Sequence, residues 1–228
     1  MLSIDRINSN ATLAAALTLY PLVFRLAVRG HVTPKRLIVS REAISALHSL
    51  LISFASAAEL YRQYEKWAPP AYRGRRAAKD DPAGARGPRP TLDIIDAQSP
   101  LGNAIVAWEC GYLIGDLVAL ILGARRTTVD GQSRSIVGRS MNWKLLGWHH
   151  LGIGSALALF HIQACRGKEK GVLVVLLMFL MNISTPFGTL HWYLAKFRPA
   201  NQMMVLLTHT AYLATYGLCR QIGNFGFR

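Results

Sequence analysis

Several ionisable residues lie inside long apolar stretches of the chain, where such groups are costly and are therefore functional candidates. Asp116 follows Glu109 and Tyr112 at the spacing i, i+3, i+7, which places all three on one face of a helix. A carboxyl group that lies deep in an apolar segment must be protonated, paired or hydrated. The spacing therefore predicts an interior polar site that contains Asp116.

Two adjacent histidines, His149 and His150, open another apolar stretch. On a helix, His150 shares a face with Gly154 and His161, whereas His149 points about 100° away. An imidazole can act as a general base or carry a transferred group. If the chain catalyses a transfer reaction, we expect His150 to act from the interior face, with His149 orienting it or contacting lipid headgroups.

Two further stretches carry polar residues at helical spacing. His48 lies beside a stripe of serines, which suits close helix packing. Asn182, Thr185 and Thr189 share one face, and Pro186 interrupts the backbone hydrogen bonding there. Polar stripes that converge in a bundle predict one interior site. The alternative is that they only join helices through hydrogen bonds of small individual worth.

The sequence offers no pattern for a metal site. The three cysteines form no CxxC pair, and they are expected to be small apolar fillers. One pair of adjacent histidines supplies too few ligands for a membrane di-metal oxidase. We therefore expect no metal, and no cofactor except acyl-coenzyme A if the chain is an acyltransferase.

The elements that must position these residues are membrane helices. Hydrophobic residues make up 51% of the 228 residues, and they gather in six blocks of roughly 17–25 residues, enough to cross about 30 Å of hydrocarbon. The predicted spans are Ala11–Val28, Ala43–Leu60, Leu101–Gly123, Leu145–Ala164, Val172–Leu194 and Gln202–Cys219. A cleaved signal peptide is the rival interpretation of the first block. The sequence predicts an all-α, polytopic transmembrane helix bundle with about six membrane helices.

The net charge of +14 comes mainly from residues between the apolar blocks. Basic residues at these positions favour membrane orientation and contact with anionic lipids, and no aromatic platform for stacking bases interleaves with them. Membrane lipids are therefore the expected partners, and nucleic acid is not. Residues 62–100 are rich in Arg, Gly, Pro and Ala, a composition that predicts a disordered basic loop.

Four segments, in order, resemble motifs of the TLC-domain membrane proteins, which include the ceramide synthases. They read SREAISALHSL from Ser40, GYLIGDL from Gly111, WHHLGIG from Trp148 and NISTPFGTLHWYL from Asn182. The resemblance covers roughly residues 36–220. It divides the chain into an N-terminal membrane helix with its connection, 1–35, and a TLC-like helical bundle, 36–228.

The resemblance is to the Ser-Thr-Pro-Phe branch of this family, which has no established synthase activity. Ceramide synthases carry an acidic His-Asp-x-x-Asp run in the helix after the double histidine, and the corresponding helix here has none. Members of the branch usually have Glu where this chain has Asn182, which cannot act as a base. The family continues with another apolar helix after the sixth span, so we expect this C-terminal helix to be missing.

The resemblance implies a membrane lipid-homeostasis protein that binds or senses a lipid or acyl chain within its helix bundle. The expected location is the endoplasmic reticulum, with the plasma membrane as the alternative. The alternative function is an acyltransferase of ceramide-synthase type that uses the His-His pair and acyl-coenzyme A. The candidate catalytic residues are His150, His149 and Asp116. The candidate lipid-binding residues are His48, Asp116, His150, Asn182, Thr185 and Pro186.

Overall fold

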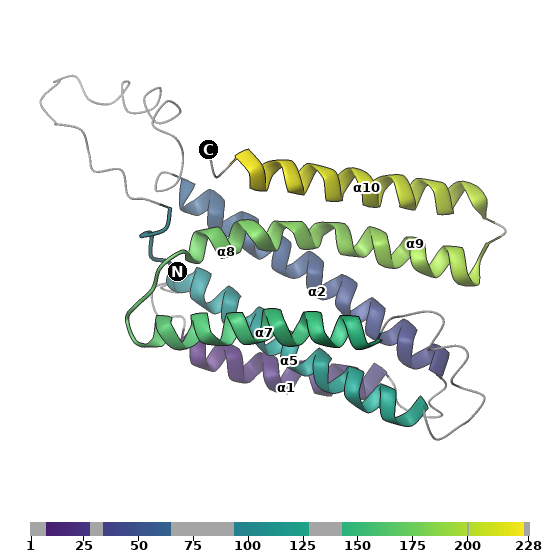
Figure 1. Ribbon diagram of the computed structural model, residues 1–228, viewed down its shortest axis with the longest axis horizontal. Helices are drawn as coiled ribbons and strands as arrows, with labels where there is room; N and C mark the ends of the chain where they lie inside the picture. The colour runs from purple at the N-terminus through teal and green to yellow at the C-terminus, as the bar shows by residue number, and fades with distance from the viewer. Residues whose placement is uncertain (1–7, 28–33, 65–93, 128–142, 200, 226–228) are drawn as a thin grey trace, which may run out of the picture.

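The computed structural model describes residues 8–27, 34–64, 94–127, 143–199 and 201–225. These residues form a bundle of long helices (Figure 1). The helical elements are α1 (Ser9–Ala27), α2 (Pro34–Arg62), α5 (Pro100–Thr127), α7 (Trp143–Cys165), α8 (Val172–Phe179), the 3₁₀ segment η2 (Leu180–Ser184), α9 (Thr185–Phe197) and α10 (Gln202–Phe225). The described part of the chain has no strand, so the prediction of an all-α bundle is confirmed.

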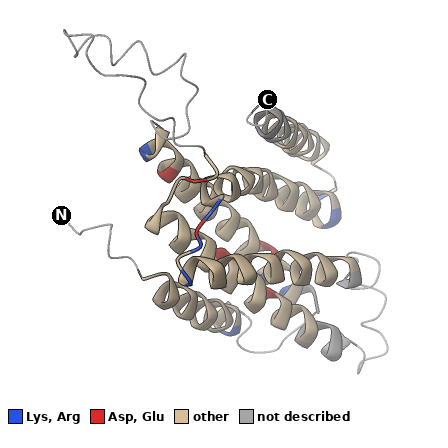
Figure 2. Ribbon diagram, turned by 60° about the vertical axis from the view of Figure 1, so that its left-hand side comes forward, with Lys and Arg blue, Asp and Glu red and all other residues tan. Residues whose placement is uncertain are grey.

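Five helical segments are long and apolar enough to cross a membrane. They are Ser9–Ala27, Arg36–Arg62, Pro100–Ile121, Leu145–Cys165 and Val172–Phe197. Long stretches of these helices carry neither acidic nor basic residues (Figure 2). The chain is therefore an integral, multi-pass membrane protein. The sixth predicted span corresponds to α10, which has 24 residues but is made less apolar by its threonines, its tyrosines and His209. That span stays a prediction.

Helix α2 lies between two groups of helices (Figure 1). On one side, α5 packs on α1 and on α7. On the other side, η2 and α9 pack on α2 and carry α10 along their outer face. The apolar core lies where α2, α5, α7 and α8 meet, and it includes Ile52, Val106, Leu157, Leu173 and Leu176. The central position of α2 means that its side chains can reach polar groups in both halves of the bundle.

The fifth membrane segment is broken in its middle. Pro186 lies in the first turn of α9, and it has no N–H to donate to the carbonyl of Asn182. The N–H of Thr185 donates to that carbonyl instead, which makes the turn 3₁₀. The predicted interruption at Pro186 is therefore confirmed. Near the break, the segment is held to α2, because Ser53 donates to the carbonyl of Phe179 at 3.2 Å.

At the end of the bundle where α2 stops, Ser99 joins three elements. Its hydroxyl caps α5 by accepting the N–H of Gly102 at 2.8 Å and donates to the buried carboxylate of Glu59. Its own N–H donates to Glu169 at 2.7 Å. Residues 65–93 of the predicted disordered loop lie outside the described residues, and the described ends of that loop belong to α2 and to this ordered junction.

Candidate functional site

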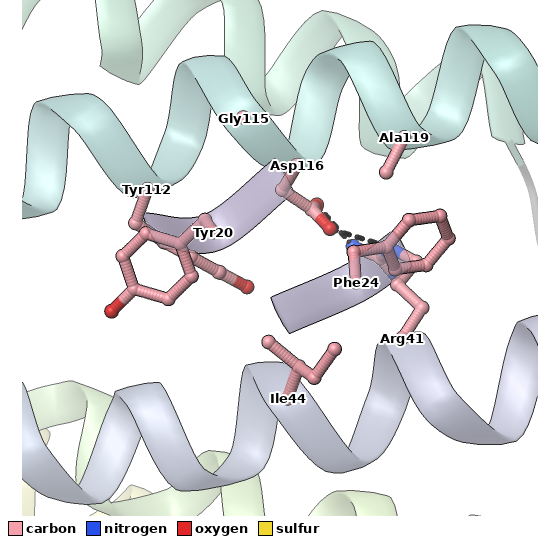
Figure 3. Close-up of a pocket in the computed structure, with 8 residues that line it drawn as sticks. All are labelled: Tyr20, Phe24, Arg41, Ile44, Tyr112, Gly115, Asp116 and Ala119. Atoms are coloured by element: carbon pink, nitrogen blue, oxygen red, sulfur yellow. Dashed lines mark hydrogen bonds and ion pairs between the residues drawn. The ribbon is translucent and has the colours of Figure 1, made fainter. Parts of the chain in front are cut away.

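A buried ion pair joins α2 to α5. Arg41 donates to both carboxylate oxygens of Asp116, at 2.8 Å from Nε and 2.5 Å from a terminal nitrogen (Figure 3). The two side chains are only 5% and 6% exposed. A two-point contact of this kind fixes the orientation of both groups. It places Asp116 at the centre of the interface between α1, α2 and α5.

Two more ionisable side chains complete this cluster. Glu42 accepts from Arg41 at 2.5 Å, and Thr189 of α9 lies in side-chain contact with Glu42. On the other side, Nδ1 of His150 lies 2.9 Å from an oxygen of Asp116. This contact brings together two of the sequence candidates, Asp116 and His150. Four elements, α2, α5, α7 and α9, thus supply one cluster of polar side chains.

A second cluster is centred on His48. Its Nε2 lies 2.5 Å from Oε2 of Glu109, and its Nδ1 meets the hydroxyl of Tyr20 from α1. The Tyr20 oxygen also accepts the indole N–H of Trp108 at 2.8 Å. The ring of Tyr112 stacks on the His48 ring with centroids 3.7 Å apart. Every polar atom of the His48 ring therefore has a partner deep in the bundle.

The two clusters are neighbours along α2 and α5. Tyr112 stacks on His48 and precedes Asp116 by one helical turn, and Arg41 precedes His48 by two. A small pocket lies between α1, α2 and α5, lined by residues of both clusters that include Tyr20, Arg41, Tyr112 and Asp116 (Figure 3). It has room for about one water molecule. The clusters thus form one continuous polar region, the interior network.

The other sequence candidates lie elsewhere. His149 is exposed, while its neighbour His150 is buried, as the 100° rotation between adjacent residues requires. Asn182, Thr185 and Pro186 belong to η2 and α9, on the side of α2 away from α5 and α7. Their part in lipid binding stays a prediction, as does that of the remaining candidates.

Sequence reasoning missed Arg41 and Tyr20. The predicted second span began at Ala43 because a hydropathy window excludes a preceding Arg-Glu pair, yet that arginine lies within the SREAISALHSL motif. A basic residue inside a motif that enters a helix was the available signal. No comparable signal existed for Tyr20, since a tyrosine in an apolar helix is more often an interface anchor. Its contact with His48 depends on how α1 docks.

The geometry allows acid–base chemistry at His150. Nδ1 of His150 lies close to the Asp116 carboxylate but has no hydrogen-bond partner among the described residues in this conformation. A hydrogen bond between them would fix the tautomer that leaves Nε2 able to take a proton, as in hydrolase triads. Arg41 holds the same carboxylate in place. Within the parts of the chain that the structure describes, no group of three or more His, Cys, Asp or Glu side chains could hold a metal ion.

Comparison with protein families shows which family the chain resembles. A family model described as the TLC domain matches residues 39–227, which span the chain from the beginning of the SREAISALHSL motif through α10. Helix α1 lies outside the matched residues. No curated protein and no solved structure shows significant similarity to the chain.

Proposed function

The chain belongs to the TLC-domain family, and from that premise we propose that it is a membrane lipid-homeostasis protein that binds or senses a lipid or acyl chain within its helix bundle. The observation that carries the proposal is the interior network. Its polar residues come from both sides of α2 and include a buried Arg41–Asp116 pair. The endoplasmic reticulum is the proposed location, with the plasma membrane as the alternative.

A buried ion pair is poor evidence of a purely structural role. In many proteins, taking both charges out of water costs more free energy than their attraction returns. Apolar residues of similar volume in the same place often stabilise the fold equally well. Ionisable side chains within membrane segments accordingly mark binding sites or transport paths. The Arg41–Asp116–His150 cluster offers both a hydrogen-bond donor and acceptors to a lipid polar group. We therefore favour lipid binding, rather than the joining of helices, as the role of the interior network.

The sequence of the fifth membrane segment favours binding over synthesis. The segment has no acidic His-Asp-x-x-Asp run, which ceramide synthases carry in the corresponding helix. Asn182 stands where relatives of the proposed branch usually have a glutamate. An amide can orient a lipid carbonyl or hydroxyl but cannot accept a proton at neutral pH. We therefore assign this chain to the Ser-Thr-Pro-Phe branch as part of the proposal.

One observation favours the second candidate, an acyltransferase. His150 Nδ1 lies 2.9 Å from an oxygen of Asp116, without a hydrogen bond, and a hydrogen bond between the two groups would give a histidine base or acyl carrier its orientation. In that reaction the imidazole would take the proton of an attacking amine, and the thiolate of coenzyme A would leave. The two functions share His150, so the same variants test both.

The deciding experiment is lipid profiling of cells that lack the protein. Cells would be complemented with the wild type, with His150→Ala or with His149→Ala, the matched control that alters an exposed neighbour. We expect His149→Ala to restore the lipid profile and His150→Ala to accumulate normally without restoring it. If both variants restore the profile, the proposed site is wrong.

A separate assay distinguishes binding from catalysis. Purified protein would be incubated with acyl-coenzyme A and a sphingoid amine, and the amide product would be measured. Binding without turnover supports our proposal. Turnover that is lost in His150→Ala would establish the acyltransferase instead.

A further inference from the structure

We propose that α1 is a displaceable plug of the interior network, and that the seam between α1 and α2 admits the uncharged, hydroxyl-bearing polar end of a lipid. The ligand hydroxyl would take the place of the Tyr20 hydroxyl against His48. This inference rests on the proposed function, because it names the entrance and the ligand class of the same site. It assigns Tyr20 as the residue that competes with the ligand.

Helix α1 is attached to the bundle mainly through one neighbour. It lies outside the matched TLC domain, Ala16 is its one buried residue in the described structure, and it packs along α5. Gly111 of α5 makes the close approach possible, since a Cβ there would lie 2.5 Å from the Cβ of Ala16. Contact between α1 and α2 is slight by comparison. The helix can therefore tilt on α5 and open towards α2.

Tyr20 is the side chain by which α1 reaches the interior network. Its hydroxyl lies between His48 and Trp108, and its ring makes edge contacts with the rings of His48 and Tyr112. Phe24, one turn further, lies over the pocket that contains Arg41 (Figure 3). These two side chains fill the seam at the level of the ionisable residues. A lipid can reach those residues by this route only if α1 moves.

The small pocket lies on this seam. Tyr20 and Phe24 of α1 face Ile44 and Arg41 of α2 across it, and residues of α5 line its third side (Figure 3). Because it has room for about one water molecule, it accommodates no lipid in this conformation. At this pocket, the polar side chains of the interior network reach the weakly packed boundary between α1 and α2. We infer that it widens into the lipid entrance when α1 tilts.

The partners of the Tyr20 oxygen define the ligand. The indole N–H of Trp108 donates to that oxygen, so a replacement must accept a hydrogen bond, which an ammonium group cannot do. The carboxylate of Glu109 lies against Nε2 of His48, which favours a proton on Nε2 and leaves Nδ1 to accept. The replacement must therefore also donate, as a hydroxyl can and an ether oxygen cannot.

Three carboxylates, those of Glu109, Asp116 and Glu42, outnumber the single guanidinium of Arg41 in this region. An anion would therefore have a raised energy there, in a medium of low dielectric. An uncharged hydroxyl meets all three conditions.

The test measures lipid binding by the purified full chain in lipid nanodiscs. The probe is a monoacylglycerol with a photoreactive acyl chain, and the control probe is its dimethyl ether, which lacks hydroxyl donors. Tyr20→Phe removes the competing hydroxyl and retains the ring, whereas Tyr61→Phe alters an exposed tyrosine of α2. We expect Tyr20→Phe to increase binding of the hydroxyl probe about 3–10-fold, the worth of one hydrogen bond. Tyr20→Phe should leave binding of the ether probe unchanged. Tyr61→Phe should leave binding of both probes unchanged.

A second variant keeps the inference testable if Tyr20→Phe misfolds. Ile44→Trp fills the seam from α2 and should reduce photolabelling by the hydroxyl probe without reducing protein yield. In the wild type, the photolabel should fall on α1 and α2, and labelling confined to α9 and α10 would overturn the inference.

The outcomes separate this inference from the proposed function. If the wild type binds the probe but Tyr20→Phe changes binding of both probes equally, or of neither, the plug is refuted and lipid binding stands. If the wild type binds neither probe and His150→Ala restores the cellular lipid profile, the proposed function itself fails.

Discussion

The Arg41–Asp116 pair should show strong energetic coupling in a double-mutant cycle. Replacing Arg41 with methionine leaves two carboxylates, Asp116 and Glu42, in the interior without their cation. Breaking a buried pair from one side costs about 3–5 kcal/mol. We therefore expect Arg41→Met to lower the free energy of unfolding by about that amount.

The opposite replacement should cost less. In Asp116→Asn, the guanidinium of Arg41 keeps its 2.5 Å contact with Glu42, and the new amide oxygen can still accept one hydrogen bond. The expected loss is about 1–3 kcal/mol, which is the range for a buried group left partly satisfied. In the double variant the two losses should not add, because Asp116 is no longer a carboxylate without its cation and only Glu42 keeps that penalty. The coupling energy should reach about 1–3 kcal/mol.

The assay is unfolding of the purified chain in micelles by titration with a denaturing detergent, followed by tryptophan fluorescence. The matched control is the cycle of Lys170→Met with Asp96→Asn, whose ion pair at 3.0 Å is 73% and 54% exposed. An exposed pair should couple by no more than about 1 kcal/mol. If the Arg41 and Asp116 variants add within about 0.5 kcal/mol, the reasoning from burial is refuted.

Three further outcomes follow from the packing. Gly111→Leu should detach α1 from α5, because a Cβ there would lie 2.5 Å from a Cβ of α1. Gly152→Leu is the control, since a Cβ at that position has no neighbour within 4 Å among the described residues. Proteolysis of α1 in micelles should be faster in the first variant and unchanged in the second. Ser99→Ala should cost about 1–2 kcal/mol by removing the cap of α5 and leaving a buried carboxylate of α2 short of a donor, as detergent-induced unfolding would show. Cys165, which is exposed, should react with a maleimide in the folded protein, whereas the buried Cys110 should react only after unfolding; unequal labelling by mass spectrometry is the criterion.

The helices could be predicted from the sequence because hydrocarbon thickness fixes their length. The predicted block Leu145–Ala164 and the observed helix α7 (Trp143–Cys165) differ by one or two residues at each end. The predicted block Ala43–Leu60 differs more, since α2 begins at Pro34. A hydropathy window stops at charged residues, but a helix continues through them when a partner such as Asp116 neutralises the charge. The missed first part of α2, residues 34–42, therefore includes Arg41.

The partners within the interior network could be predicted only in part. Helical spacing put Glu109, Tyr112 and Asp116 on one face, and the structure shows Glu109 against His48 and Asp116 against His150. Spacing along one helix carries no information about which helix lies opposite. For that reason the position of Asn182 on the far side of α2, and the reach of Tyr20 from α1, required the packed bundle.

The separation of Arg41 from Asp116 along the chain has a consequence for how the protein is made. The partners are 75 residues apart in sequence, and a ribosome that adds about 5–20 residues per second synthesises them roughly 4–15 s apart. Throughout that delay the guanidinium of Arg41 has its neighbour Glu42 but not yet Asp116 as a counter-charge, and hydrocarbon is a costly environment for ionisable side chains. Stable burial of α2 in the bilayer is therefore linked to the arrival of α5, and insertion of the two helices becomes a single cooperative event. A chain stalled between them should remain at the insertion machinery.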